Sequence, residues 1–211
     1  MPRRTLIRWS CLLAALLPAA CAPRYAVRAG LPAAEQEGRR EIMAYAATLV
    51  GTGDLRAVDR SFRNDCSGYV NGVFAISGRP IAYAKVRRDR PLSESLYRSL
   101  EHRGLVSAAG PPAPADAVFF RNTYDTPYDC ITHVGLVEAV GDDGTVTILH
   151  YASGRVGRIR MNLRRPDVHR DAGGRVLNDY VRKSRDGSPR KDYLAGRLFQ
   201  AFGDLYRYTS R

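Results

Sequence analysis

The sequence predicts an α+β domain in which N-terminal helices pack on an antiparallel β-sheet. Up to about residue 104, apolar residues recur at the three- and four-residue spacing of amphipathic helices. From residue 116 onward, short runs of apolar and β-branched residues are separated by turns that contain glycine. Hydrophobic residues make up 45% of the 211 residues, enough for one ordinary core. The chain therefore suits one domain with extensions at its ends.

Two of the predicted helices serve mainly to build the core. Residues 39–50 have apolar side chains at helical spacing, and Gly51 is expected to end this helix. A later helix is predicted to start with Ser93 as its N-cap and to stop at Gly104. Both helices would cover one face of the sheet.

A third helix carries the first candidate for chemistry. Asp65 lies where an N-cap residue belongs, so Cys66 would occupy the first turn, and Gly78 supplies the stop. Unpaired backbone N–H groups and the positive end of the helix dipole favour a thiolate at that position. We therefore expect the pKa of the Cys66 thiol to be lowered. A nucleophilic thiolate still needs a base and a group that orients the base.

Both partners occur downstream on two predicted strands. Residues 132–137 and 145–151 flank a turn at residues 141–144, and each strand carries one histidine. A turn of two or four residues places His150 on the same sheet face as His133 and diagonal to it, about 7–8 Å away at the backbone. A loop of odd length would put the two histidines on opposite faces.

Four short blocks occur in a fixed order along the chain: Asp65-Cys66-Ser67-Gly68, Pro114-Ala115-Asp116-Ala117-Val118-Phe119-Phe120, His133-Val134-Gly135-Leu136 and Leu149-His150-Tyr151-Ala152. In type and order they resemble the NlpC/P60 family of cell-wall cysteine peptidases, over about residues 40–165. The resemblance implies a papain-like fold with Cys66 as nucleophile, His133 as general base and His150 as the residue that orients His133. It also implies peptidoglycan stem peptides as substrate, most often cut between D-glutamate and the diamino acid through a thioester, without a cofactor.

Two positions depart from that family pattern. The family usually has a tyrosine shortly before the cysteine block, which helps to stabilise the oxyanion, but residues 51–64 contain Phe62 and no tyrosine. The oxyanion donor other than the Cys66 N–H therefore stays open. The usual Pro-Gly-Asp is Pro114-Ala115-Asp116 here, which is a mild change.

Two other functions remain as alternatives. One is a CHAP-type amidase, which uses the same cysteine–histidine chemistry on the bond between sugar and peptide. The other is a catalytically idle envelope lipoprotein that holds peptidoglycan or a partner. The absent tyrosine and the C-terminal tail favour this second alternative. Cys130 is expected to be a half-buried small residue, although a disulfide with Cys66 would silence the nucleophile.

The N-terminus has the form of a secretory signal peptide. Three arginines precede an apolar run at residues 11–20, which is shorter than the about 20 residues of a membrane span. Residues 17–21 resemble a bacterial lipobox with Cys21 as the lipidated first residue of the mature chain, and simple secretion is the alternative. We expect a periplasm-facing envelope protein, in the outer membrane of a Gram-negative source, with a membrane anchor at Cys21.

The expected domain organisation follows from these segments. Residues 1–20 are the signal peptide, 21–38 a tether rich in alanine and proline, and 39–165 the catalytic domain. Residues 166–211 form a basic extension, in which residues 193–202 have apolar side chains at helical spacing and predict a closing helix. We expect that helix to dock on the domain, because some 45 residues make a marginal independent domain.

Charge and motif content limit the partners. The net charge is +12, and loss of residues 1–20, with three arginines and no acidic residue, leaves +9. A basic protein suits a negatively charged envelope, while the export signal argues against nucleic acid. The cysteine and histidine spacings are not those of a zinc site, and we expect a monomer without a metal or cofactor. The aromatic residues of 122–131 either line a groove or cover one end of the sheet.

Overall fold

The computed structural model describes residues 28–83, 88–182 and 190–210, which form a mixed α+β fold with one six-stranded antiparallel sheet. The strands, in the sheet order β1-β6-β2-β3-β4-β5, are β1 (Val106–Ser107), β6 (Phe199–Gly203), β2 (Ala117–Arg121), β3 (Ile131–Val140), β4 (Thr145–Ala152) and β5 (Arg155–Asn162). The helices are α1 (Ala33–Thr48), α2 (Cys66–Ile76), α3 (Leu92–His102), α4 (Ala195–Leu198) and α5 (Leu205–Thr209), with short 3-10 turns at Leu55–Ala57 and Lys191–Tyr193. The predicted signal peptide and Cys21 lie outside the described residues.

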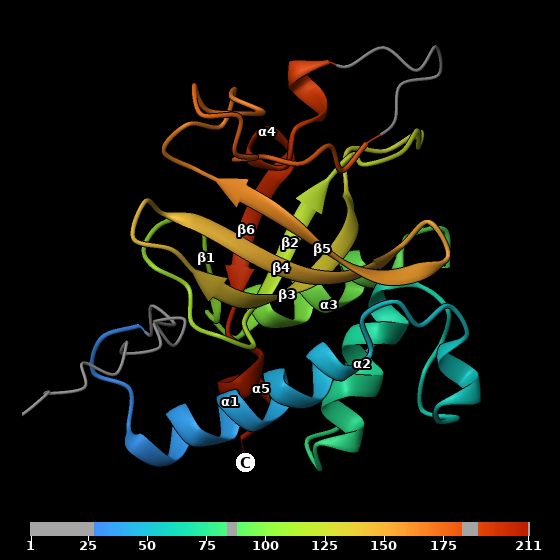
Figure 1. Ribbon diagram of the computed structural model, residues 1–211. Coiled ribbons are helices and arrows are strands. Elements are labelled where there is room, and N and C mark those ends of the chain that lie inside the picture. The colour runs from blue at the N-terminus through green and yellow to red at the C-terminus, as the bar shows by residue number, and fades with distance from the viewer. Residues whose placement is uncertain (1–27, 84–87, 183–189, 211) are drawn as a thin grey trace, which may run out of the picture.

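Two hydrophobic cores lie on opposite faces of the sheet. α1, α2 and α3 cover one face, and α4 lies on the other side (Figure 1). The alternation along β2 follows the prediction, because Phe119 belongs to the helix-side core while Val118 and Phe120 belong to the opposite one. The strands in the middle of the sheet therefore need apolar side chains on both faces.

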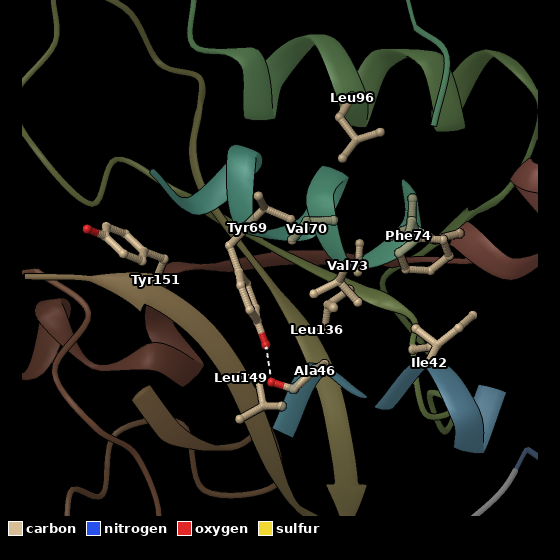
Figure 2. Close-up of a cluster of buried hydrophobic side chains, with 14 of the residues drawn as sticks. Ile42, Ala46, Tyr69, Val70, Val73, Phe74, Leu96, Leu136, Leu149 and Tyr151 are labelled. Carbon is tan, nitrogen blue, oxygen red and sulfur yellow. Dashed lines mark hydrogen bonds between the residues drawn. The ribbon is translucent and has the colours of Figure 1, made fainter. Parts of the chain in front are cut away.

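α2 sits at the centre of the helix-side core and matches its prediction. It begins at Cys66, and its face toward the sheet is fully buried around Val70, Val73 and Phe74 (Figure 2). Tyr69 is also fully buried, and its hydroxyl donates to the carbonyl of Ala46 in α1 at 3.1 Å. This contact ties α1 to the helix that carries the cysteine.

α1 starts six residues earlier than predicted, at Ala33. Pro32 has a φ of −56° immediately before it, which suits a helix entry, and Glu35 lies in the first turn at the positive end of the dipole. Residues 33–38 are therefore helical and continuous with residues 39–48, not a tether of irregular chain. The apolar stripe did not predict the first turns of α1, because those turns are polar.

α3 also differs from its prediction at the N-terminus. It begins at Leu92 behind Pro91, so Ser93 lies inside the first turn and is not the N-cap. The Ser93 hydroxyl instead donates to the carbonyl of Ile131 at 3.1 Å, and Glu94 accepts from the N–H of Ile131 at 2.7 Å. The first turn of α3 thereby fixes the start of β3.

The loop between β3 and β4 has an odd length, contrary to the expectation. The Gly141 N–H donates to the carbonyl of Thr145 at 2.9 Å, which leaves a three-residue loop at residues 142–144. Gly144 has a φ of +80°, the left-handed conformation that three-residue hairpin loops require. By itself, this three-residue loop would place the two histidines on opposite faces of the sheet.

A β-bulge at Glu138 shifts the strand register back by one residue. On the turn side Ala139 pairs with Thr147, whereas beyond the bulge Val137 pairs with Ile148. One extra residue in β3 thus compensates for the odd loop. His133 and His150 lie on the same face, as predicted, but they do so because the bulge offsets the odd loop, and neither feature was predicted.

The predicted closing helix at residues 193–202 is wrong in most of its length. Only Ala195–Leu198 are helical, and Phe199–Gly203 form β6, which pairs with β2 on one side and β1 on the other. Ala201 enters the helix-side core and Phe202 the opposite core. A short apolar segment fits both spacings, and pairing with two strands decides between them. The C-terminal segment is therefore part of the sheet and not an extension outside it.

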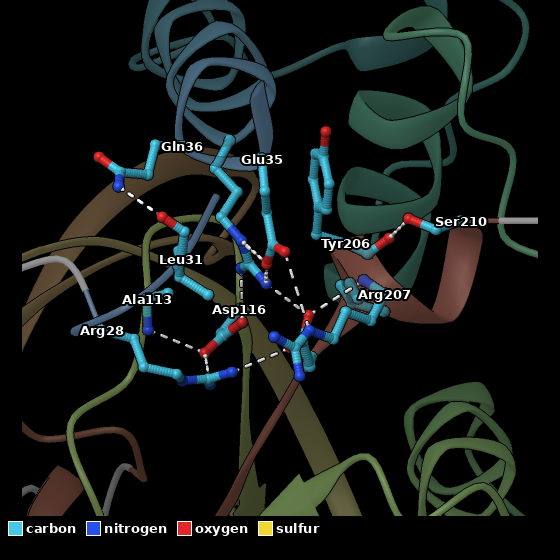
Figure 3. A network of polar contacts seen from close by, with 12 residues as sticks. Arg28, Leu31, Glu35, Gln36, Ala113, Asp116, Tyr206, Arg207 and Ser210 are labelled. Carbon is cyan, nitrogen blue, oxygen red and sulfur yellow. Dashed lines mark hydrogen bonds and ion pairs between the residues drawn. The ribbon is translucent and has the colours of Figure 1, made fainter. Parts of the chain in front are cut away.

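A network of ion pairs joins the N-terminal segment to the sheet. Arg39 in α1 is only 1% exposed, and its guanidinium lies 2.8 Å from Asp116 and 2.5 Å from Asp204. Arg28 reaches the same two carboxylates at 2.7 and 2.9 Å, as Figure 3 shows for its contact with Asp116. Asp204 also caps α5 by accepting from the N–H of Arg207. The network therefore holds α1, the start of β2 and α5 together.

Among the helices of the described residues, none is both long and apolar enough to cross a membrane.

Candidate active site

The helix start that carries Cys66 is held by a compact set of polar contacts. Asp65 accepts from the Gly68 N–H at 2.7 Å and from the Ser67 hydroxyl at 2.7 Å, so it is the N-cap that the sequence predicts. Arg63 donates to Ser67 at 3.0 Å. A Cβ at Gly68 would lie 2.4 Å from the Cβ of Arg63, so this tight entry needs glycine. The position of Cys66 is thus fixed by its neighbours in sequence.

The thiol of Cys66 lies near the strand that carries the first histidine. The N–H groups of Val134 in β3 and of Ser67 are close enough to the sulfur to lower the pKa of the thiol. The β3–β4 ladder ends at the pair Leu136 and Leu149, so Val134 lies just beyond its last pair. α2 packs against both β3 and β4.

The pKa of the Cys66 thiol is raised to about 11, and the expectation of a lowered value was wrong. Burial is the largest cause, and the carboxylate of Asp65 acts in the same direction. The hydrogen bonds from Val134 and Ser67 lower the pKa, but they do not outweigh burial. The resting cysteine is consequently a neutral thiol.

His133 and His150 form a hydrogen-bonded pair. His133 Nε2 lies 2.8 Å from His150 Nδ1, and the rings meet edge to face at 86° with their centroids 5.1 Å apart. One imidazole donates the proton and the other accepts it. Since Nε2 of His133 is engaged in this way, its Nδ1 is the nitrogen that remains for a reacting group.

Gly135 makes room for this pair. A Cβ at Gly135 would lie 2.6 Å from Cγ2 of Ile148, 2.8 Å from the Leu149 carbonyl oxygen and 3.3 Å from Cβ of His150. The close approach of β4 to β3 at this point therefore requires glycine. The ring of Phe120 flanks His133 on the β2 side, with centroids 6.0 Å apart.

Burial keeps both imidazoles neutral. The pKa of His133 is lowered to about 3, chiefly by burial and further by His150. Burial likewise lowers the pKa of His150 to about 4. A protonated imidazole is disfavoured here in the resting protein, so His133 has the protonation state of a base.

All three predicted site residues lie at the same end of β3. The amide of Val134, the next residue after His133, influences the pKa of Cys66, and His133 hydrogen-bonds to His150. His133 pairs with Phe120 of the core opposite α2, so the thiol and the imidazole approach β3 from different sides. Within the described residues, no hydrogen bond joins the Cys66 thiol to the His133 ring. Catalytic hydrogen bonds often tighten only when substrate is bound.

A groove of about 1050 Å³ opens over the histidine pair. Its lining includes both histidines, the loop at Thr123–Asp125 and the start of β5, but not Cys66. The C-terminal segment supplies the facing wall with residues 180–182, Arg190 and Tyr193. Of the two aromatic residues in the 122–131 loop, Tyr124 thus lines a groove, whereas Tyr128 is not part of its lining and stacks with Arg90.

The chain was compared with protein-family models, with curated proteins and with solved structures. None of the three comparisons gave a match. The roles of the site residues therefore rest on the sequence pattern and on the geometry described above.

Tyr124 belongs to the site, although the sequence analysis gave it no specific role. It lines the groove, it is 49% exposed, and its pKa is raised by burial and by the nearby thiols of Cys66 and Cys130. The family pattern places a tyrosine before the cysteine, where this chain has none. The tyrosine near Cys66 instead comes from the loop between β2 and β3.

Cys130 is a buried free cysteine. It is 2% exposed, less than the half-buried position that we expected, and its sulfur lies 3.9 Å from the Thr126 hydroxyl. Cys66 is also free, so no disulfide joins the two. Within the part of the chain that the structure describes, no cluster of three or more histidine, cysteine, aspartate or glutamate residues is arranged to hold a metal ion.

Proposed function

We propose that this protein is a cysteine peptidase that hydrolyses peptidoglycan stem peptides, with a papain-like arrangement of the type found in the NlpC/P60 family. One observation carries the proposal. Cys66 opens α2, which packs against β3, and β3 carries a histidine that is hydrogen-bonded to a second histidine in β4. This arrangement supports Cys66 as nucleophile, His133 as base and His150 as the orienting group.

The reaction starts from a neutral thiol and a neutral imidazole. His133 takes the proton of the Cys66 thiol as the sulfur attacks the peptide carbonyl carbon, and the carbonyl oxygen becomes an oxyanion. The C–N bond then breaks while His133 gives the proton to the leaving amine, which leaves a thioester. His133 next takes a proton from water, the hydroxide attacks the thioester, and the thiol regains its proton on release. His150 holds one tautomer of His133 throughout.

Backbone N–H groups at the start of α2 stabilise the oxyanion. The N–H groups of Cys66 and Ser67 lie at the positive end of the helix dipole and lower the pKa of the thiol, so they are the donors that we assign to the oxyanion. Tyr124 is the side chain that we assign to the role of the missing family tyrosine, because it lines the groove beside the histidine pair and the Cys66 thiol influences its pKa. Each such donor typically contributes about 10²–10³ in rate.

The substrate class and the location come from the sequence pattern. We propose cleavage between D-glutamate and the diamino acid, in an envelope lipoprotein exported by residues 1–20 and anchored at Cys21. The high positive charge fits a negatively charged envelope. No cofactor enters this mechanism.

A binding function is the second candidate, and one observation favours it. The Cys66 thiol is strongly held in its protonated form and, among the described residues, makes no hydrogen bond to His133. A catalytically idle domain would retain the groove and bind a stem peptide without cutting it. The experiment below separates the two functions.

The test uses the full chain with native Cys66 and a Cys66→Ser variant. Each is incubated under reducing conditions with defined peptidoglycan fragments, and products are measured by mass spectrometry. Cleavage by the native chain alone supports the peptidase, and product masses distinguish an endopeptidase from an amidase. If both chains return intact fragments, the peptidase proposal is wrong and the binding function replaces it.

A further inference from the structure

The C-terminal segment is attached firmly to the groove. Arg182 donates to the carbonyl of Asn122 at 2.8 Å and forms an ion pair with Asp125, so it connects this wall to the opposite loop. Tyr180 pairs with Leu194 in an isolated bridge. The C-terminal wall of the groove is therefore held in place against the loop that lines the other side of the histidine pair.

The charges in the groove do not balance. Asp125 is compensated by Arg182, and Arg190 lies 3.4 Å from Asp192. Burial keeps both histidines uncharged. Arg155 is the remaining cation of the described lining; it is exposed, and its side chain forms no hydrogen bond or ion pair with a described residue. Among its described residues, the groove thus offers one uncompensated positive charge.

The strand register places Arg155 close to the histidine pair. It pairs with Ala152 across a tight turn, while Gly157 pairs with His150, so these four residues share one face of the sheet. Two residues along a strand span roughly 7 Å. Arg155 therefore lies two residues along β5 from the position that pairs with His150.

Gly157 leaves space beside His150. A Cβ added at Gly157 would meet no heavy atom within 4 Å, and its φ lies outside the left-handed region. Any side chain there would project into the groove. Glycine therefore keeps an open floor between the histidine pair and Arg155, wide enough for part of a ligand. Tyr180, which is 39% exposed, provides an aromatic surface on the facing wall.

We propose that this groove selects a peptide with a free carboxylate next to the scissile bond, and that Arg155 binds this carboxylate. A guanidinium and a carboxylate form two parallel charge-assisted hydrogen bonds, which favour the acid over its neutral amide. The inference rests on the proposed function for the scissile bond. Recognition of the carboxylate can nevertheless be measured without any cleavage.

The test measures binding by calorimetry to the full chain with Cys66→Ala, which removes the nucleophile. The probes are a γ-D-glutamyl stem tripeptide with its free α-carboxylate and the same tripeptide with that group as an amide. We expect the full chain to bind the acid more tightly than the amide. The substitution Arg155→Gln should weaken binding of the acid by about 10-fold or more and leave binding of the amide unchanged. Arg160→Gln, an exposed arginine on the opposite face of β5, is the matched control and should change neither affinity.

Two further results are decisive. Gly157→Val fills the floor of the groove and should weaken both peptides alike. The inference is overturned if Arg155→Gln weakens acid and amide equally, if it has no more effect than Arg160→Gln, or if Gly157→Val changes neither affinity. Absence of binding of both peptides to the parent chain also overturns it. Failure of the native chain to cleave a peptide that binds in this way would reject only the peptidase proposal.

Discussion

His133 Nε2 and His150 Nδ1 lie 2.8 Å apart across two neighbouring strands, just beyond the last ladder pair, Leu136 and Leu149. The contact depends on two local deviations in the β3–β4 hairpin, a three-residue loop and a bulge at Glu138, which cancel each other. Either one alone would turn His150 to the other face. The hydrogen bond between the two histidines thus depends on the strand register as well as on the residues themselves.

Replacement of His150 should impair catalysis without loss of the fold. His150→Ala leaves His133 Nε2 without its partner, and we expect kcat/KM to fall by about 10²-fold. His150→Gln keeps a neutral hydrogen-bonding group and should lose less. Steady-state cleavage of a stem peptide measures both, with thermal unfolding as the check on folding. Equal losses for the two variants would contradict an orienting role through this hydrogen bond.

Gly135 should tolerate no side chain. Gly135→Ala places a Cβ 2.6 Å from Ile148 and 2.8 Å from the Leu149 carbonyl, so we expect the free energy of unfolding to fall by about 1–3 kcal/mol. Gly157→Ala, on the same face of the neighbouring β5, meets no atom and is the matched control. Chemical denaturation measures both. Similar stabilities for the two variants would show that β4 can move away from β3 at no cost.

The histidine pair should make stability depend on pH. The pKa values of His133 and His150 fall from about 6.5 in the unfolded chain to about 3 and about 4, so the unfolded state binds more protons between pH 4 and 6.5. The stabilisation that comes from keeping these histidines neutral is fully present above pH 6.5, and it is lost as the pH falls from 6.5 to 4. The loss for one histidine is on the order of 1–2 kcal/mol between pH 6.5 and 4.5.

The measurement compares urea unfolding of the native chain and of His150→Gln across this range. The native chain should lose more stability on acidification than the variant, because a glutamine side chain does not titrate. Carboxylates titrate in both proteins, and the difference between the two curves removes their contribution. Parallel curves would contradict burial as the cause of the lowered pKa values.

Alkylation of Cys66 should be slow at neutral pH. Its pKa of about 11 leaves little thiolate, so reaction with iodoacetamide at pH 8 is expected to be at least about 10-fold slower than for an unperturbed thiol. The rate should rise steadily with pH. Asp65→Asn keeps a capping side chain but removes a charge that raises the pKa, and should increase the rate. Peptide mapping assigns the label, and a rate that is already constant below pH 7 would indicate a thiolate–imidazolium pair instead.

The sequence was sufficient where a structure depends on neighbouring residues. The cap by Asp65, the start of α2 and the strands bearing His133 and His150 were all predicted, because capping and short-range periodicity determine them. The bulge at Glu138 was not, because one extra residue in a strand leaves no local mark. The thiol pKa was wrong for a similar reason, since burial by distant segments outweighs the helix N-terminus.

The C-terminal segment illustrates the same limit at a larger scale. Its apolar spacing favoured a helix, but the gap between β1 and β2 can be filled only by a strand. Its wall of the groove could not be predicted either, because residues 180–182, Arg190 and Tyr193 come near the histidines only through tertiary packing. The identity of the candidate residues was thus predictable, while the shape of the site around them was not.

The place of β6 has a consequence for biosynthesis. This strand lies between β1 and β2, and residues 199–203 are translated long after the other strands of the sheet. A nascent chain that has not reached residue 203 has a gap in its sheet, and the hydrogen-bonding edge of β2 stays unpaired. The six-stranded sheet can therefore be completed only when the last residues of the chain have been made.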